Sequence, residues 1–180
     1  MEFIKLFIVG SIGYFLSGLY DVAILYDKSL LKRILFIGFF ITGVPYLFLP
    51  SLVTSPFSHV VLLFAIPLLL VFVWLLLYSV FFEIRKNDEK SSSLYQKGTY
   101  SFSRHPGFLW YTTINCIIAV YFWDMRVALL CVGFTLCNLV LIFVEDVVLF
   151  PLMFEEYREY KKHTPFLVSL DSLLHWRWLR

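Results

Sequence analysis

The residues best suited to chemistry in this 180-residue chain form two polar groups beside long apolar runs. Arg104-His105-Pro106 stands at the start of one run, and Glu145-Asp146 lies near the end of another. A carboxylate inside a membrane segment is costly unless it is paired, hydrated or turned toward a cavity, so it usually marks a working site. These two groups are therefore the first candidates for a functional site.

The two adjacent carboxylates are expected to have different roles. Successive residues of a helix point about 100° apart, so Glu145 and Asp146 cannot share one partner. Asn138 lies on nearly the same helical face as Glu145. We expect Glu145 to face a polar pocket and Asp146 to pair with Arg104 or Arg158. The alternative is a helix that ends just before both carboxylates and leaves them in water.

Taken singly, the other candidates also have ordinary explanations at a membrane boundary. Arg104 can anchor to lipid headgroups, His105 can be an interfacial donor, and tyrosines often form an aromatic belt. Only their joint order and spacing favour a site.

The composition indicates which elements must position these residues. Hydrophobic residues make up 60% of the chain and aromatic residues 20%, with a mean hydropathy of +0.80. A single soluble core cannot hide so much apolar surface. The sequence therefore predicts an all-α, polytopic membrane protein.

Apolar runs near the length of a membrane span occur five times. Pro50 closes the second run, Pro106 suits the first turn of the fourth, and residues 124–126 form a polar turn before the fifth. The first run is too long, and lacks the cleavage pattern, for a signal peptide. The expected helices are 3–24, 34–49, 60–82, 106–123 and 127–150.

The charges support this count, because positive residues concentrate on the cytoplasmic side of membranes. With five spans, thirteen of the fifteen lysines and arginines fall on one side, and only Lys5 and Arg126 on the other. We therefore expect an integral protein of the plasma or inner membrane, or its equivalent, with the N-terminus outside. Residues 1–180 form one domain: a three-helix scaffold over 1–82 and a functional half over 83–180, whose loop and tail are cytoplasmic.

The tail contains a predicted amphipathic helix. Tyr157 and Tyr160 share one side, and charged residues occupy the others. Taken alone, such a segment is ordinarily a surface helix along the bilayer, with Trp176 and Trp178 as interfacial anchors.

Several other classes of site are not expected. The net charge of +2 and the lack of a phosphate-binding loop argue against nucleic acid. Cys116, Cys131 and Cys137 lie in apolar runs without metal-like spacing, so we expect buried packing thiols, and neither a disulfide nor a metal site. The oligomeric state is left open.

In order and spacing, the C-terminal half resembles the isoprenylcysteine carboxyl methyltransferase family, integral membrane enzymes related to the phospholipid methyltransferases. The matching residues are Gly98, Tyr100, Arg104, His105, Pro106, Phe108, Glu145, Asp146, Leu149, Met153, Phe154, Glu156, Tyr157, Tyr160 and Pro165.

Three positions depart from the family pattern. Phe108 replaces tyrosine, Asp146 replaces glutamate, and Met153-Phe154 stands for Phe-Gly. The family glycine lets the chain turn after the last span, and Pro151 is expected to make that break here.

The resemblance implies methyl transfer from S-adenosylmethionine to a lipophilic or small acceptor that is reached from the membrane. It also implies a cofactor pocket built from the loop before the fourth helix, the end of the fifth and the tail helix. Arg104 and Glu145 are the candidate catalytic residues. The candidate cofactor-binding residues are Tyr100, His105, Pro106, Phe108, Glu145, Asp146 and Tyr157.

The acceptor and the activity remain open at this stage. The acceptor could be a carboxylate of an isoprenylcysteine-like molecule, a phospholipid amine or a thiol. Sterol reductases share a similar C-terminal pattern, so a membrane reductase that uses NADPH is an alternative. A non-catalytic membrane protein that assembles with partners is another.

Overall fold

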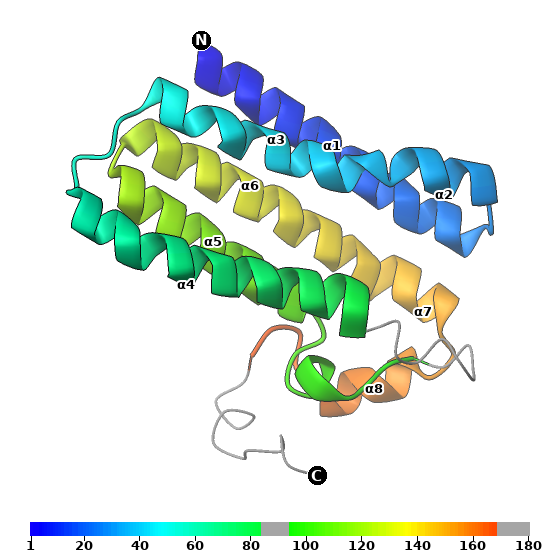
Figure 1. The fold of residues 1–180 in the computed structure, drawn as a ribbon. Coiled ribbons are helices and arrows are strands. Elements are labelled where there is room, and N and C mark those ends of the chain that lie inside the picture. Colours follow the sequence, from blue (N-terminus) through cyan, green and yellow to red (C-terminus); the bar gives the residue numbers. More distant parts are fainter. Residues whose placement is uncertain (84–93, 169–180) are drawn as a thin grey trace.

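The computed structural model describes residues 1–83 and 94–168, apart from the side chain of His59 (Figure 1). Within these residues the secondary structure is helical and contains no strand. This confirms the prediction of an all-α chain.

Four helical stretches are long and apolar enough to cross a membrane. By contrast, α5 (Pro106–Phe122) is a shorter apolar helix, so the fifth span stays a prediction. The four stretches are α1 (Glu2–Leu25); α2 (Ser29–Leu35) with α3 (Ile37–Leu52); α4 (His59–Leu77) with the π-helix η1 (Tyr78–Glu83); and α6 (Met125–Val144) with the π-helix η4 (Glu145–Leu149) and α7 (Phe150–Met153).

The second stretch is longer than the predicted helix 34–49. It begins at Ser29, because the charged residues Lys32 and Arg33 are part of α2 rather than of a loop. At the other end, Pro50 lies in the last turn of α3 and does not close it. The Val53 N–H still donates to the Leu49 carbonyl at 3.0 Å. A proline so near a helix end removes one bond without stopping the turn that follows.

Successive helices run between two opposite ends of the bundle (Figure 1). At one end the Ser55 hydroxyl donates to the Tyr121 carbonyl at 2.6 Å, and Arg126 lies over the Phe3 ring. Asp124 caps α6 there by accepting from two backbone N–H groups, so the connection after α5 is shorter than the predicted turn 124–126. The opposite end holds the loop before α5, η4 and α8 (Tyr157–His163), and we call it the site end.

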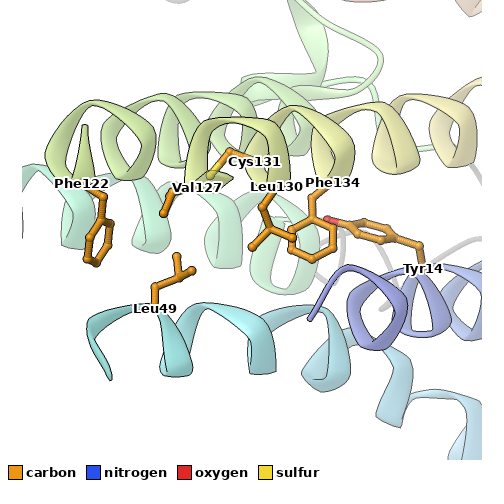
Figure 2. Packing of buried hydrophobic residues seen from close by; sticks show 7 residues of the cluster. All are labelled: Tyr14, Leu49, Phe122, Val127, Leu130, Cys131 and Phe134. Carbon is orange, nitrogen blue, oxygen red and sulfur yellow. The ribbon is translucent and has the colours of Figure 1, made fainter. Parts of the chain in front are cut away.

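The interior is built around α6, which contacts α1 and α5, while α3 packs on α1 and α4 packs on α5. The core residues drawn in Figure 2 come from α1, α3, α5 and α6. Small residues bring α1 and α3 together: a Cβ on Gly13 would lie 2.7 Å from the Thr42 backbone nitrogen. Close backbone contact therefore holds the scaffold together.

The outer surface of the bundle is apolar. None of residues 60–77 is buried, although almost all of them are aliphatic or aromatic. A soluble protein rarely exposes such a surface. The pattern is that of helices in contact with lipid, which supports the prediction of a membrane protein.

A hydrogen-bonded chain of side chains joins four helices in the middle of the bundle. The Tyr14 hydroxyl donates to that of Tyr111, which lies 2.5 Å from the Tyr46 hydroxyl. Tyr46 donates to Asn115 Oδ1 at 2.7 Å, and Asn115 Nδ2 donates to Thr135 Oγ1 at 3.2 Å. We call these five residues the tyrosine network.

The three cysteines differ in their surroundings. Cys131 is buried and Cys137 half-buried, but Cys116 is exposed on the outside of α5. The prediction of buried packing thiols is therefore wrong for Cys116. An apolar run in the sequence does not distinguish residues that face lipid from residues that face the core.

Candidate functional site

The loop before α5 is held in place by its own backbone. Pro106 occupies the first turn of α5, where a missing N–H has no cost. The His105 N–H donates to Ser103 Oγ at 3.1 Å, and the Arg104 N–H donates to the Pro165 carbonyl at 3.0 Å. The loop is thus tied to the tail at the position that precedes His105.

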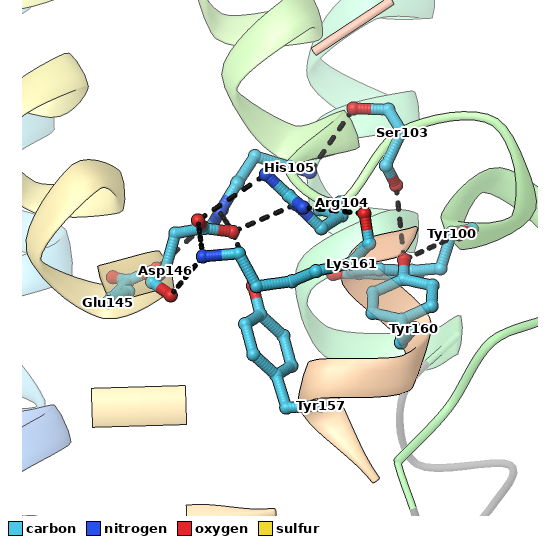
Figure 3. A network of polar contacts seen from close by, with 9 residues as sticks. All are labelled: Tyr100, Ser103, Arg104, His105, Glu145, Asp146, Tyr157, Tyr160 and Lys161. Carbon is cyan, nitrogen blue, oxygen red and sulfur yellow. Dashed lines mark hydrogen bonds and ion pairs between the residues drawn. The ribbon is translucent and has the colours of Figure 1, made fainter. Parts of the chain in front are cut away.

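Asp146 is the centre of a polar cluster (Figure 3). Its Oδ1 lies 2.9 Å from Arg104 Nε and accepts from the Tyr157 hydroxyl at 2.6 Å. Its Oδ2 lies 2.7 Å from Lys161 Nζ. Only 3% of Asp146 is exposed. A buried carboxylate needs this many partners, and here they come from two separate segments, the loop before α5 and the tail helix α8.

Arg104 points into the protein and not toward lipid headgroups. Its side chain is 9% exposed, its Nη2 donates to Asp146 at 3.4 Å, and its Nη1 donates to the Lys161 carbonyl at 3.3 Å. The Nε–H group is buried and close to Asp146 Oδ1, but it is not aimed at that oxygen and makes no hydrogen bond. The expected pair of Asp146 with Arg104 is present, whereas Arg158 takes no part.

Glu145 lies beside this cluster with different neighbours. Its side chain is 14% exposed, and Oε2 is 3.9 Å from His105 Nδ1. Across from it, α1 contacts η4, and Asp21 of α1 interacts electrostatically with Glu145. Within the described residues no lysine or arginine lies within 4.0 Å of either carboxyl group. The alternative in which both adjacent carboxylates lie in water is wrong, because Asp146 is buried and the Glu145 side chain is only 14% exposed.

The His105 ring stands between the two carboxylates. It stacks on Phe150 with centroids 5.9 Å apart and meets the edge of Phe166 at 5.0 Å. Burial lowers the pKa of His105, although Asp146 acts in the opposite direction. The imidazole is therefore neutral near pH 7. Its Nε2, 3.5 Å from Asp146 Oδ1, is buried without a hydrogen bond.

The tail helix α8 packs into the site through its tyrosine side. Tyr157 and Tyr160 are buried, and the Tyr160 hydroxyl donates to the Tyr100 carbonyl at 2.6 Å. Burial raises the pKa of both phenols, so they remain protonated donors. The charged face of α8 is exposed, as an amphipathic helix requires. Trp176 and Trp178 lie outside the described residues.

A second buried carboxylate, Glu83, closes the loop on its other side. Its two oxygens accept from the N–H and the hydroxyl of Thr99. Gly98 has φ +58°, and a Cβ there would lie only 1.8 Å from Glu83 Oε1. Sequence reasoning missed Glu83, Thr99, Lys161 and Asp21. The signal in the sequence that could have identified Glu83 was its position at the end of an apolar run, at the other end of the loop from Gly98-Thr99.

The remaining predicted residues have mixed outcomes. Tyr100 donates its hydroxyl to the Ser79 carbonyl at 3.2 Å and joins the cluster through Tyr160. Phe108 is buried on α5, but among the described residues it makes neither a ring stack nor a polar contact with the cluster. Pro151 does not break the helix: α7 continues to Met153, and the chain becomes extended at Phe154. The Phe154 ring packs against the edge of Phe150.

Two predictions about the site are not settled by the geometry. The predicted cytoplasmic loop falls mostly on residues 84–93, outside the described part of the chain. A cofactor pocket also stays a prediction, because Asp146 and Arg104 are turned toward each other. Within residues 1–83 and 94–168 no three His, Cys, Asp or Glu side chains gather to hold a metal ion.

Comparison of this chain with family models, curated proteins and solved structures gives no guide to the assignment. No protein-family model matches it, and no curated protein or solved structure is significantly similar. The resemblance to the methyltransferases therefore rests on the motif residues alone.

Proposed function

We propose that this protein is an integral membrane methyltransferase that uses S-adenosylmethionine. One observation carries the proposal: candidate residues from distant parts of the sequence meet in one buried cluster at the site end. These residues are Arg104, His105, Glu145, Asp146 and Tyr157. A chance motif match would not require them to be neighbours.

The groups in the cluster suit the cofactor chemically. It carries a carboxylate, an amino group, a sulfonium and an adenine ring. His105 Nε2 is buried without a hydrogen bond, so it is available to a ligand; Arg104 Nε lies 2.9 Å from Asp146 Oδ1 but makes no hydrogen bond to it. Arg104 would hold the carboxylate, and the rings of Phe150 and Phe166 offer flat apolar contacts to adenine. When bound, the cofactor supplies a methyl group activated by the positive sulfur.

The protein's own contribution is alignment, exclusion of water and proton transfer. The low exposure of His105 and Asp146 keeps the reacting region dry. Asp146 is a positioning residue, because its oxygens are used by Arg104, Tyr157 and Lys161. Among the described residues no lysine or arginine lies within 4.0 Å of Glu145, and its carboxylate can take a proton from an acceptor that must lose one. A carboxylate acceptor would be ionised already and would not need it.

Calorimetric titration of the purified protein with S-adenosylhomocysteine, alongside NADPH, tests the proposal. The methyltransferase assignment predicts saturable binding of S-adenosylhomocysteine and none of NADPH. Binding of NADPH alone would assign a reductase, and binding of neither would indicate an assembly protein.

The Arg104→Ala and Arg158→Ala variants make a matched pair for this titration. Arg104 is buried at the centre of the cluster, whereas Arg158 is exposed on α8. Removing a charged partner from a buried site costs about 2 to 5 kcal/mol of binding free energy. Arg158→Ala should leave the affinity unchanged, and an equal loss in both variants would place the cofactor elsewhere.

A further inference from the structure

Residues 161–166, the end of α8 and the chain after it, cover part of the site, and we call them the tail strap. Arg104 Nη1 donates to the Lys161 carbonyl at 3.3 Å. The Phe166 ring meets His105 edge-on, with centroids 5.0 Å apart, and its centroid lies 5.7 Å from Arg104 Cζ. The strap therefore lies over two residues that the proposed function assigns to its ligand.

A ligand can reach Arg104 and His105 only if an element that covers them moves. Their side chains are 9% and 5% exposed. Two of their other neighbours, Asp146 and Phe150, belong to the membrane-length stretch that runs from α6 through α7. The tail strap is part of none of the four such stretches, so it is the element that can move without disturbing the bundle.

The strap is anchored at its start and held more loosely beyond it. Tyr157 and Tyr160 of α8 are buried, and their hydroxyls donate to partners in the site at 2.6 Å each. Within the strap only Thr164 is buried, and the backbone there is extended. A segment with little buried apolar surface opens more readily than a packed helix. The end of α8 is therefore the hinge.

The ion pair between Lys161 and Asp146 fastens the strap (Figure 3). Lys161 Nζ lies 2.7 Å from Asp146 Oδ2 and also donates to the Asp146 carbonyl at 3.2 Å. The Asp146 side chain is 4% exposed, whereas that of Lys161 is 32% exposed. A lysine ammonium sits on a flexible stem and is strongly hydrated when it is released. The pair can therefore open toward solvent while Asp146 stays in place.

Release of Lys161 does not leave Asp146 without a cation. An arginine–carboxylate pair is frequently made of two short parallel hydrogen bonds. Here Arg104 Nη2 is 3.4 Å from Asp146 Oδ2, and Nε, 2.9 Å from Oδ1, makes no hydrogen bond. Two cations thus share one carboxylate, and a rotation of the guanidinium lets Arg104 serve it alone. Opening therefore avoids the cost of an unpaired buried charge.

We propose that the tail strap is a lid, latched by the Lys161–Asp146 ion pair, which opens to admit the ligand. Opening also frees Arg104 Nη1 from the Lys161 carbonyl. The identity of the ligand rests on the proposed function, in which Arg104 would hold the carboxylate of the cofactor. Lys161 restrains access to the site and does not bind the ligand.

Modification of His105 by diethyl pyrocarbonate measures the opening without any ligand. The reagent acylates accessible neutral imidazoles, and mass spectrometry of peptides from the full chain in nonionic detergent gives the rate at each histidine. Lys161→Met should speed the modification of His105 by about fivefold or more, because the latch is lost. Loss of the Lys161 charge raises the pKa of His105, which alone would slow the reaction, so a faster rate reports exposure. The exposed His163 is the internal reference.

Lys162→Met is the matched control, because Lys162 is exposed on α8 and pairs with Glu159 at 2.7 Å. It should leave the rate at His105 unchanged. Gly38→Ala, which crowds α3 against α1, tests for general loosening of the bundle and should also leave this rate unchanged. Equal rates at His105 in Lys161→Met and the wild type, or an equal rise in either control variant, would overturn the lid.

S-adenosylhomocysteine, added to the same samples, separates the lid from the proposed function. Both are supported if it protects His105 in the wild type and associates faster with Lys161→Met than with Lys162→Met. A faster rate at His105 in Lys161→Met without any protection would keep the lid and remove the methyltransferase. Protection with equal rates at His105 in the two lysine variants would keep the methyltransferase and overturn the lid.

Discussion

The tyrosine network makes a directional prediction about stability. Asn115 Oδ1 can only accept, so Tyr46 must use its single proton there. Tyr111 must then donate to Tyr46, and Tyr14 must donate to Tyr111. The three hydroxyls therefore have fixed and different roles, which a Tyr→Phe series can distinguish.

Tyr46→Phe should be the most damaging change in this series. It removes two hydrogen bonds and leaves both the Tyr111 proton and Asn115 Oδ1 without partners. Hydrogen bonds between membrane helices contribute about 0.6 kcal/mol on average and about 1.7 at most. The loss of unfolding free energy should then be about 1 to 3.5 kcal/mol. Tyr14→Phe removes one bond and leaves only a spare acceptor on Tyr111, so we expect about 0.6 kcal/mol.

Equilibrium unfolding in sodium dodecyl sulfate, followed by circular dichroism, measures these differences. Tyr26→Phe is the control, because this tyrosine is 67% exposed after α1, and it should change nothing. A loss in Tyr14→Phe equal to or larger than that in Tyr46→Phe would refute the assigned direction of the network.

Three further changes test other parts of the structure. Gly38→Ala should destabilise the protein by about 1 to 3 kcal/mol, since the new Cβ would lie 2.8 Å from the Ser17 nitrogen. Gly43→Ala, where a Cβ would have nothing within 4 Å, should be neutral or stabilising. Similar unfolding midpoints in the two variants would contradict the close packing of α1 on α3. Asp124→Ala should lower the thermal midpoint at pH 7. The hydrogen bonds from the Arg126 side chain, and then those from the Arg126 and Val127 N–H groups, lower the pKa of Asp124 to about 2. The difference from wild type should therefore shrink as the pH falls from about 4 toward 2, and a constant difference would contradict these bonds. Burial lowers the pKa of His105 on folding, so the folded state has its full stability only above the unfolded pKa of about 6.5, and the unfolding free energy should fall below that pH. The slope of unfolding free energy against pH should flatten in His105→Gln. An unchanged slope would contradict a buried neutral imidazole.

The helices were predictable because their main determinant is local. Apolar runs of span length placed four stretches and α5 to within a few residues, except around residues 29–52. There, charged residues suggested a loop, but at a helix end near the membrane boundary they are tolerated. Pro50 suggested a stop, but it lies too close to the end of α3 to act as one.

The motif also predicted part of the site. Order and spacing singled out Arg104, His105, Asp146 and Tyr157, which meet in space. Their individual roles depend on which way each side chain turns, and the π-helical turn η4 decides this for Glu145 and Asp146. Such a turn leaves no signature in hydropathy.

Contacts between distant helices could not be read from one sequence. Asp21 looked like a polar residue in a scaffold helix, and Glu83 looked like the first residue of a loop. The role of each depends on a partner that helix packing brings near: Glu145 for Asp21, and Thr99 for Glu83. The tyrosine network is of the same kind, because the rotation of four helices determines which hydroxyls meet.

Photolabelling with S-adenosylmethionine tests the central claim most directly. The protein in nonionic detergent would be irradiated with the methyl-tritiated cofactor, with and without excess S-adenosylhomocysteine, and its labelled peptides sequenced. The proposed function predicts label within residues 94–112 or 145–168, lost in the presence of S-adenosylhomocysteine. Label confined to the α1–α3 scaffold, or label that S-adenosylhomocysteine does not compete away, would contradict a cofactor site built around Arg104 and His105.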